Sequence, residues 1–349
     1  MCSRGSSTSG SNGTSGSNGT RSTGRREQRR WQEQPQVALA TAAAPYMILD
    51  MSTALITGCS SGFGILIART LASHGHHVYA SMRQMDGRNA GAAQDQRDWA
   101  RTHTVALETL ELDVSSDESV KRAVDRILAD GKSIDVVVNN AAISSFGPLE
   151  AYTSEQMLDL LSVNVVGPMR VNNAVLPTMR RQHSGLIIWI TSTLGRVLPS
   201  IGGLYPATKW AAEGFAESLH YQLRPFGIDV VILEPGSFPT PATWKGVDPV
   251  RSAIVSEYAA ALPPSDAAPV EPAPDYTPPD PQEVADAVKG LVDMPAGQRP
   301  LRLVVGPVFT EGVADYNATY LQVRTNLERS LQRPDQAITW TPDAQARTS

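Results

Sequence analysis

Tyr205 and Lys209 are the two residues whose spacing most directly indicates proton-transfer chemistry. They lie four residues apart in a segment expected to be helical, so both side chains project from one helix face. An unperturbed tyrosine has a pKa of about 10 and is a poor base near neutrality. A neighbouring ammonium favours the phenolate, so we expect Lys209 to lower the pKa of Tyr205 and make it a general acid/base. Ser192, thirteen residues before Tyr205, is expected to donate a hydrogen bond to a substrate oxygen on which charge develops.

A glycine-rich segment follows the first apolar run of the chain. Residues 54–56 lead directly into Thr57-Gly58-Cys59-Ser60-Ser61-Gly62-Phe63-Gly64. Glycines in this GxxxGxG spacing let the backbone turn tightly and approach a pyrophosphate, which then lies at the N-terminus of the next helix. A plain tight turn is the alternative interpretation. The segment is a candidate site for a dinucleotide.

Short apolar strands alternate with amphipathic helices from Thr53 onward. We expect strands at residues 54–56, 78–80, 110–112, 134–138, 186–190, 228–233 and 301–305. We expect helices at residues 64–74, 203–224 and 314–332. Two more helices are expected to begin at capping boxes, one at Ser115 with Glu118 and one at Thr153 with Gln156, the second of them running toward Met179. A polar loop is expected to follow the second strand. The alternation predicts an α/β fold, a single Rossmann-type doubly wound parallel sheet of about seven strands with helices on both faces, over residues 51–332.

The two ends of the chain and one internal segment differ from this pattern. Residues 1–50 are rich in Gly, Ser and Arg and are expected to be a disordered leader, and residues 333–349 a flexible tail. Residues 239–281 hold eleven of the 25 prolines, so regular structure there must be short. This segment follows the sixth strand, at the edge of the sheet where ligands bind, and is either a substrate lid or a flexible surface insertion.

Composition excludes several other functions. The net charge of −5 gives no basic field for nucleic acid, and no apolar run is long enough to span a membrane. Two cysteines, with no hydrophobic signal segment at the N-terminus, suit a cytoplasmic protein. The histidines at positions 74, 76 and 77 have no Cys or acidic companion, so we expect no metal site.

Further motifs follow the glycine-rich segment in order along the chain. They are Asp113-Val114, Asn139-Asn140-Ala141, Asn164, Ser192 with Tyr205 and Lys209, and Pro235-Gly236 with Thr240. In these motifs and their spacing the chain resembles the short-chain dehydrogenase/reductase family, in the branch with the YxxxK site. The resemblance is strong over residues 52–240 and looser to about residue 330. It implies an oxidoreductase that transfers a hydride between a nicotinamide cofactor and a carbonyl/secondary alcohol pair of a small molecule.

The resemblance also implies roles for single residues. Lys209 would bind the nicotinamide ribose as well, Asn164 would order a proton-relay water, Asp113 would face the adenine, and Thr240 would meet the carboxamide. The expected catalytic residues are Asn164, Ser192, Tyr205 and Lys209. The expected cofactor-binding residues are Thr57, Gly58, Ser60, Ser61, Gly62, Phe63, Gly64, Arg83, Asp113, Val114, Asn140, Ala141, Tyr205, Lys209, Pro235, Gly236 and Thr240. Family members are often dimers or tetramers, so we expect a homodimer or homotetramer.

The end of the second strand bears on the choice of cofactor. Relatives that bind NAD(H) place an acidic residue there, whereas this chain has no carboxylate before Asp86. Arg83, with the hydroxyls of Ser60 and Ser61, is expected to bind the 2′-phosphate of NADP(H); a solvent-facing arginine is the alternative. The segment VYASMR, with GCSSGFG, resembles the hydroxysteroid and retinol dehydrogenase branch. A non-catalytic NADP(H)-binding sensor or scaffold is the alternative function, although such proteins usually lose the tyrosine or the lysine.

Overall fold

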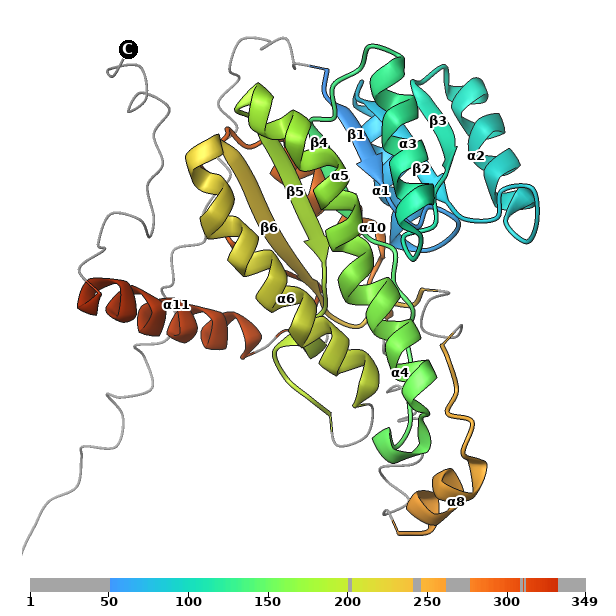
Figure 1. Cartoon of the computed structure of the whole chain (residues 1–349), viewed down its shortest axis with the longest axis vertical. Helices are drawn as coiled ribbons and strands as arrows, with labels where there is room; N and C mark the ends of the chain where they lie inside the picture. The colour runs from blue at the N-terminus through green and yellow to red at the C-terminus, as the bar shows by residue number, and fades with distance from the viewer. Residues whose placement is uncertain are drawn as a thin grey trace, which may run out of the picture. The chain divides into compact units, whose positions relative to one another are not determined.

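Seven parallel strands form one sheet in the part of the chain that the structure describes (Figure 1). The structure is a computed structural model, and it describes residues 51–199, 203–240, 246–261, 277–307, 310 and 312–331. The strands are β1 (Thr53–Ile56), β2 (His77–Met82), β3 (Leu107–Glu111), β4 (Val136–Asn139), β5 (Gly185–Ile190), β6 (Ile228–Pro235) and β7 (Arg302–Val305). Their spatial order is β3-β2-β1-β4-β5-β6-β7. The order reverses between β1 and β4, which is the place where a doubly wound sheet binds ligands.

Helices cover both faces of the sheet. They are α1 (Phe63–Ser73), α2 (Ala90–His103), α3 (Asp117–Ala129), α4 (Ser154–Leu161), α5 (Gly167–Gln182), α6 (Leu204–Leu223), α8 (Ser252–Ala261), α10 (Gln282–Asp293) and α11 (Val313–Ser330). The apolar faces of α1 and α10 belong to one buried cluster, and those of α3, α5 and α6 to another. Figure 1 shows α5 and α6 in front of the sheet. The predicted Rossmann-type fold is confirmed.

The strands are apolar on both faces because both faces are covered. In β1, Ala54 and Ile56 belong to the first cluster, whereas Leu55 belongs to the second. Trp189 in β5 is 1% exposed and lies in the second cluster. This is the pattern of a parallel sheet between two helical layers, and it is the reason that continuous apolar runs identified the strands.

Three local predictions were wrong. The segment after β2 is not simply a polar loop, because it contains α2, whose buried positions are only Ala93, Gln96 and Ala100. Helix α3 is capped by Ser116, which accepts a hydrogen bond from the Ser119 amide, and not by Ser115. The helix expected to run toward Met179 is interrupted by a π-helical turn, η2 (Ser162–Val166). The capping box of Thr153 and Gln156 is confirmed.

Several predictions concern residues outside the described ones. These are the leader at residues 1–50, the tail at 333–349, and positions 241–245 and 262–276 of the proline-rich segment. The described part of that segment includes α8, which is ten residues long. The interpretation of the segment as a lid stays a prediction. Among the described helices, none has both the length and the apolar character needed to cross a membrane.

Candidate active site

Ser192, Tyr205 and Lys209 lie at the junction of β5 and α6. Ser192 follows the end of β5, and its hydroxyl accepts a hydrogen bond of 3.1 Å from the Leu194 amide in the turn η3 (Thr193–Gly195). Tyr205 and Lys209 occupy successive turns of α6, and the ammonium of Lys209 lies 5.5 Å from the centre of the Tyr205 ring. Lys209 is 4% exposed and donates a 2.9 Å hydrogen bond to the Ile190 carbonyl. The start of α6 is thereby joined to the end of β5.

The electrostatics of Tyr205 differ from the prediction. Burial of the phenol raises the pKa of Tyr205 to about 12, and a hydrogen bond with Ser192 opposes that rise only in part. We expected Lys209 to lower the pKa of Tyr205, and this prediction is wrong for the observed arrangement. The cost of burying the phenolate is larger than the stabilisation that the distant ammonium provides. Tyr205 is therefore a neutral phenol near neutral pH and keeps its proton. Burial also lowers the pKa of Lys209 to about 8, against the effect of Glu213, which raises it.

Asn164 lies in the π-helical turn η2, where the backbone departs from a regular helix. Its side chain pairs with both backbone groups of Ile143: the Ile143 amide donates to Oδ1, and Nδ2 donates to the Ile143 carbonyl, each at 2.8 Å. Nδ2 also donates to the Thr208 hydroxyl at 3.0 Å. Thr208 in turn donates to the Tyr205 carbonyl at 2.7 Å. Asn164 therefore connects the segment after β4 to the helix that carries Tyr205.

Thr208 was not singled out by the sequence. It lies between Tyr205 and Lys209, and its signal is a hydroxyl three residues after the tyrosine on one helix, a spacing at which Ser and Thr bond back to a helix carbonyl. The Ile190 carbonyl, which accepts from Lys209, leaves no such signal, since every residue has a carbonyl group.

The glycine-rich segment and the segment after β4 are held together by Thr57 and Asn140. The Thr57 hydroxyl accepts from the amides of Asn140 and Ala141, both at 3.0 Å. The Asn140 side chain donates to the carbonyls of Thr57 at 2.8 Å and Gly58 at 3.2 Å. Because β1 and β4 are the strands at which the order reverses, this network shapes the expected cofactor site.

Gly58 and Gly64 are required by this close approach. Gly58 has φ +76°, and a Cβ there would lie 2.8 Å from the Cα of Ala141. A Cβ on Gly64 would lie 2.4 Å from the Gly58 carbonyl oxygen. Gly62 is the N-cap residue of α1, and the helix has no side-chain cap and no acidic residue in its first turn. Its first amides are therefore suited to an anion such as a pyrophosphate, which fits the expected cofactor.

The segment after β6 approaches the same loop. The rings of Phe63 and Phe238 pack edge to face with centroids 5.6 Å apart, and a Cβ on Gly62 would lie 3.7 Å from the Cβ of Thr240. Pro235 ends β6, and the Gly236 amide donates to the Val305 carbonyl. The structure thus brings Thr240 next to the loop predicted to bind the pyrophosphate.

Arg83 and Asp113, at the ends of β2 and β3, face each other. Arg83 Nη1 lies 3.9 Å from Asp113 Oδ2 in a partly exposed ion pair. Burial alone would raise the pKa of Asp113. Hydrogen bonds from Ser115 and the charge of Arg83 outweigh that effect, so the pKa lies below its ordinary value. Val114 is buried against Gly167, where an added Cβ would lie 3.0 Å away. Ser60 and Ser61 are partly exposed in the glycine-rich loop, and their predicted contact with a cofactor phosphate stays a prediction.

Cys59, His76 and His77 each have a hydrogen-bond partner within the fold. Cys59 is fully buried, its thiol donates to the Ile56 carbonyl, and burial raises its pKa. His77 pairs with Glu108 at 2.9 Å, and His76 with the Ser52 hydroxyl at the same distance. Across the described ranges, no group of three His, Cys, Asp or Glu side chains is arranged to hold a metal ion.

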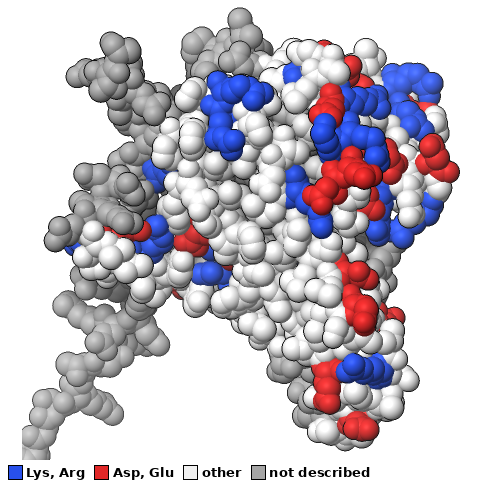
Figure 2. Space-filling view, in the orientation of Figure 1, with Lys and Arg blue, Asp and Glu red and all other residues white. Residues whose placement is uncertain are grey.

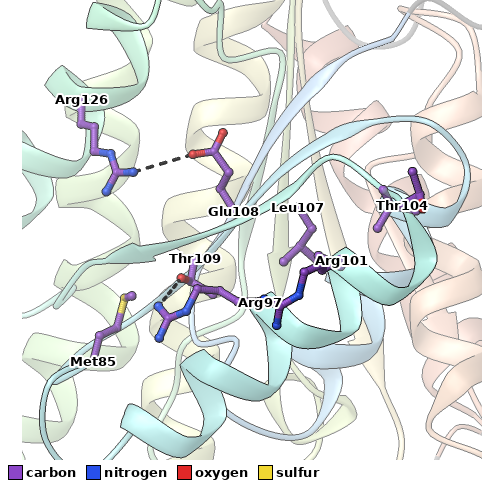
Figure 3. A pocket seen from close by; sticks show the side chains of 10 residues that line it. Met85, Arg97, Arg101, Thr104, Leu107, Glu108, Thr109 and Arg126 are labelled. Carbon is purple, nitrogen blue, oxygen red and sulfur yellow. Dashed lines mark hydrogen bonds and ion pairs between the residues drawn. The ribbon is translucent and has the colours of Figure 1, made fainter.

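An open groove of about 720 Å³ lies elsewhere, along the edge strand β3 (Figure 3). Its arginines already have partners: Arg97 donates to the Thr109 hydroxyl at 3.0 Å, and Arg126 lies 3.7 Å from Glu108. Strands β2, β1 and β4 separate β3 from β5 in the sheet. We therefore place the candidate site at the ends of β1, β4, β5 and β6 and not in this groove.

Comparisons with known proteins identify relatives of this chain. A model of the short chain dehydrogenase family matches residues 52–249. Retinol dehydrogenase 8 of Bos taurus is 37% identical over 204 residues, which are 58% of this chain and 64% of that protein. The 17-beta-hydroxysteroid dehydrogenase type 1 of Homo sapiens is 38% identical over 190 residues, 52% of this chain and 55% of that protein. The match spans less than two thirds of the length of either relative.

Solved structures share the fold over most of the described chain. A short-chain dehydrogenase from Streptomyces avermitilis is 28% identical with a TM-score of 0.61, covering 81% of this chain and 98% of that one. An alcohol dehydrogenase from the archaeon Thermococcus sibiricus, solved with 5-hydroxy-NADP, is 29% identical with a TM-score of 0.59, covering 73% and 96% of the two chains. The similarity to these structures thus covers more of the chain than the family match does.

Proposed function

The chain belongs to the short chain dehydrogenase family, and on that premise we propose that it is an enzyme transferring a hydride between NADP(H) and a carbonyl/secondary alcohol pair. The observation that carries the proposal is the convergence of Ser192, Tyr205 and Lys209 at the end of β5. These groups supply a hydrogen-bond donor, a proton donor and a cation at one place, which is the set that carbonyl reduction needs.

In the reducing direction, each side chain has one task. Bound NADPH would supply the hydride that the carbonyl carbon accepts. The Ser192 hydroxyl donates a hydrogen bond to the carbonyl oxygen as negative charge develops on it. The neutral Tyr205 phenol gives that oxygen its proton, so that an alcohol is released. The Lys209 ammonium stabilises the phenolate that remains until a proton returns from solvent.

The preference for NADP(H) is the finer part of the proposal. Arg83 stands at the end of β2 with its guanidinium partly exposed, and its ion pair with Asp113, at 3.9 Å, is loose. A guanidinium can bind a phosphate through two parallel hydrogen bonds, and such bonds are stronger than those between neutral groups. The archaeal neighbour solved with an NADP derivative supports the same choice.

The surroundings of the site favour a substrate with an apolar body. Phe146 and Leu149, after β4, are 47% and 49% exposed, and Val197 and Leu198, after η3, are 54% and 53% exposed. Leu149 lies against Gly203, which comes two residues before Tyr205. A Cβ added to Gly203 would be 3.6 Å from the Cβ of Leu149. Exposed apolar side chains close to a candidate site are typical of a surface that binds an apolar ligand. The retinoid and steroid named in the two curated relatives are of this class.

The test is a screen of ketones, aldehydes and secondary alcohols, followed by the absorbance of NADPH. We expect turnover with apolar carbonyl compounds, and its loss in Tyr205→Phe. Tyr79→Phe is the matched control, since Tyr79 is buried in β2, outside the candidate site. A wild-type protein that binds NADPH but turns over none of these compounds would favour the non-catalytic sensor or scaffold.

We also propose a homo-oligomer. Figure 2 shows few charged side chains over α5 and α6, while both signs gather over the region of α2 and α3. Trp210 and Phe215 of α6 are 37% and 46% exposed, and Val166, just before α5, is 42% exposed. Such a face suits association with a second copy of the chain. Light scattering of the purified protein measures the mass, and a monomer at micromolar concentration would contradict the proposal.

A further inference from the structure

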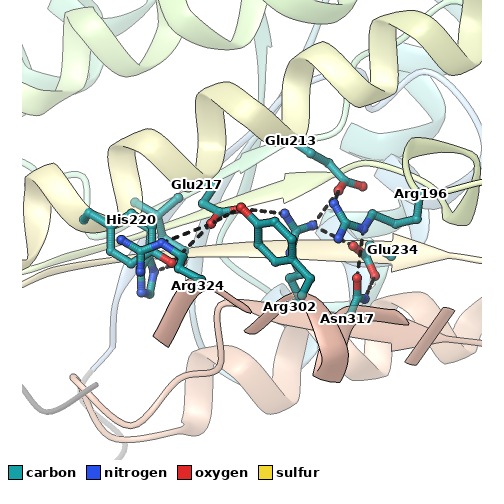
Figure 4. Close-up of polar contacts among 11 residues, drawn as sticks. Arg196, Glu213, Glu217, His220, Glu234, Arg302, Asn317 and Arg324 are labelled. Atoms are coloured by element: carbon teal, nitrogen blue, oxygen red, sulfur yellow. Dashed lines mark hydrogen bonds and ion pairs between the residues drawn. The ribbon is translucent and has the colours of Figure 1, made fainter. Parts of the chain in front are cut away.

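Helix α11 is joined to the rest of the fold by a set of buried charged and polar side chains, which we call the buried charge network (Figure 4). Its members are Arg196, Glu213, Glu217, Glu234, Arg302, Asn317 and Arg324. Glu213 is 2% exposed and Glu234 is 0% exposed. Ionised groups are costly to bury unless each has close partners, so the arrangement of such a network is geometrically demanding.

Arg302 of β7 is the centre of the network. Its Nη1 donates to Glu213 of α6 and, at 2.8 Å, to Glu234 of β6, and its Nη2 donates at 2.8 Å to Glu217 of α6. One guanidinium thus holds three carboxylates from two elements. Burial and the charge of Glu234 raise the pKa of Glu213 well above its ordinary value, and Arg302 opposes that rise only in part. These contacts join α6, which carries Tyr205 and Lys209, to β6 and β7.

Arg196 connects the network to the turn after Ser192. Its Nη1 lies 3.5 Å from Glu213 Oε2, and its Nε donates at 2.9 Å to Asn317 of α11. Two rings of α11 flank its guanidinium, with the centroid of Tyr316 at 4.6 Å and that of Tyr320 at 5.0 Å. Most of the contacts that fix this side chain therefore come from α11.

The turn itself packs on Glu213. A Cβ on Gly195 would lie 2.3 Å from Glu213 Oε1, so the backbone of η3 lies directly against that carboxylate. Gly195 comes three residues after Ser192, and Glu213 comes one helical turn after Lys209. The contact between Arg196, Gly195 and Glu213 therefore spans the two segments that carry the proposed catalytic groups.

We propose that Arg196 and Asn317 are positioning residues, through which helix α11 sets the placement of Ser192 relative to Tyr205 and Lys209. The effect on turnover rests on the proposed function. Asn317 has a second link to the site, because its Nδ2 donates to Glu234, the residue before Pro235. Hydride and proton transfer depend steeply on placement, and a shift of about 1 Å can cost about 100-fold in rate.

The test compares two substitutions in α11. Asn317→Ala removes the hydrogen-bond partner of Arg196 on α11, whereas Arg324→Gln removes the ion pairs of the same helix with Glu217 and Glu328 and leaves the contacts of Arg196 in place. We expect Asn317→Ala to lower kcat by about 10- to 100-fold and to leave the Kd for NADPH within about twofold of wild type. Arg324→Gln should lower Tm but keep kcat. Tyr316→Ala is a second variant, which removes one of the two α11 rings beside the Arg196 guanidinium. Tyr316 is 43% exposed, so its loss leaves no buried void.

A second measurement needs no turnover. The amides of Gly195, Arg196 and Val197 donate within the turn after Ser192, and we expect Asn317→Ala to speed their hydrogen exchange by roughly tenfold or more. The Cys59 amide, bonded to the Ser81 carbonyl, is the internal reference and should not change. Unchanged exchange in the turn, or a kcat that falls equally in Arg324→Gln, would overturn the proposal. If wild type turns over no substrate, the proposed function fails. The exchange measurement still tests whether α11 fixes the turn after Ser192.

Discussion

The Lys209 ammonium donates its hydrogen bond to the Ile190 carbonyl, two residues before Ser192, and not to the Tyr205 hydroxyl. This contact fixes the lysine at the end of β5 and leaves its charge 5.5 Å from the centre of the tyrosine ring. The lysine therefore does not ionise the tyrosine in advance. In the proposed mechanism its charge would stabilise the negative charge that develops on the tyrosine oxygen as the proton leaves, so the stabilisation is greater in the transition state than in the ground state.

The pH dependence of reduction follows from Lys209. Burial lowers the pKa of Lys209 to about 8, so its charged fraction decreases as the pH rises through that value. The charged form is the one that stabilises the phenolate, so we expect kcat for reduction to be constant below this pH and to fall above it. Lys209→Arg keeps the charge, because arginine stays protonated, and should lose this alkaline fall even if its kcat is lower. A wild-type profile that stays flat to pH 10 would contradict the assignment.

Tyr205→Phe tests the proton donor with the smallest change. The substitution removes one hydroxyl and should leave the fold and the Kd for NADPH unchanged. We expect kcat to fall by roughly 10²–10⁴, the range for loss of a general acid/base. Measurement of kcat, Kd and Tm on one preparation separates chemistry from folding. Near-normal turnover would end the proposed mechanism.

The close approach at Gly64 gives a prediction about stability. A Cβ there would meet the Gly58 carbonyl oxygen at 2.4 Å, so the loop must shift in Gly64→Ala. We expect a loss of about 1–3 kcal/mol in the free energy of unfolding and weaker NADPH binding. Gly214→Ala is the matched control, since Gly214 lies in α6 with open space around it. It should gain about 0.5–1 kcal/mol, as alanine does over glycine in a helix. Equal effects of the two substitutions would show that the loop is not tightly packed.

The fold class and most of the strands could be predicted because both depend on local signals. Strands buried on both faces appear as continuous apolar runs such as Leu186–Ile190, and the motif residues follow the strand ends at which a parallel sheet gathers them. The missed helix α2 had no such signal. Its buried face consists of two alanines and Gln96, so its sequence is as polar as a loop.

The buried charge network could not be predicted, since its members are far apart in the chain. Arg196, Glu213 and Asn317 each have the sequence appearance of a solvated charged or polar residue, and only the packing of α11 brings them together. The pKa of Tyr205 was mispredicted for a related reason. The spacing of Tyr205 and Lys209 indicates one helix face, but it does not show that the ammonium turns toward Ile190 or how deeply the phenol is buried.

The choice of cofactor is tested at Arg83. Its guanidinium is partly exposed and pairs only loosely with Asp113, at 3.9 Å, so it is free to bind a 2′-phosphate. A hydrogen bond to a charged group contributes about 1.5–3 kcal/mol, so we expect Arg83→Ala to raise KM for NADPH by about tenfold to a few hundredfold. KM for NADH should hardly change, because that cofactor carries no 2′-phosphate. Asp113→Asn should strengthen the preference for NADPH, since it removes the carboxylate that competes for the guanidinium.

The control for Arg83 lies five residues further along the same segment. Arg88 is exposed, and Arg88→Ala removes the same charge from the surface near α2 without changing the end of β2. If a general positive field attracted NADPH, both substitutions would raise its KM by similar factors and the effect would vanish at high salt. If Arg83 binds the phosphate directly, only Arg83→Ala has a large effect, and kcat/KM for the two cofactors converges in that variant. A wild-type enzyme that prefers NADH would show that Arg83 does not face the ribose, and the proposal for NADP(H) would be abandoned.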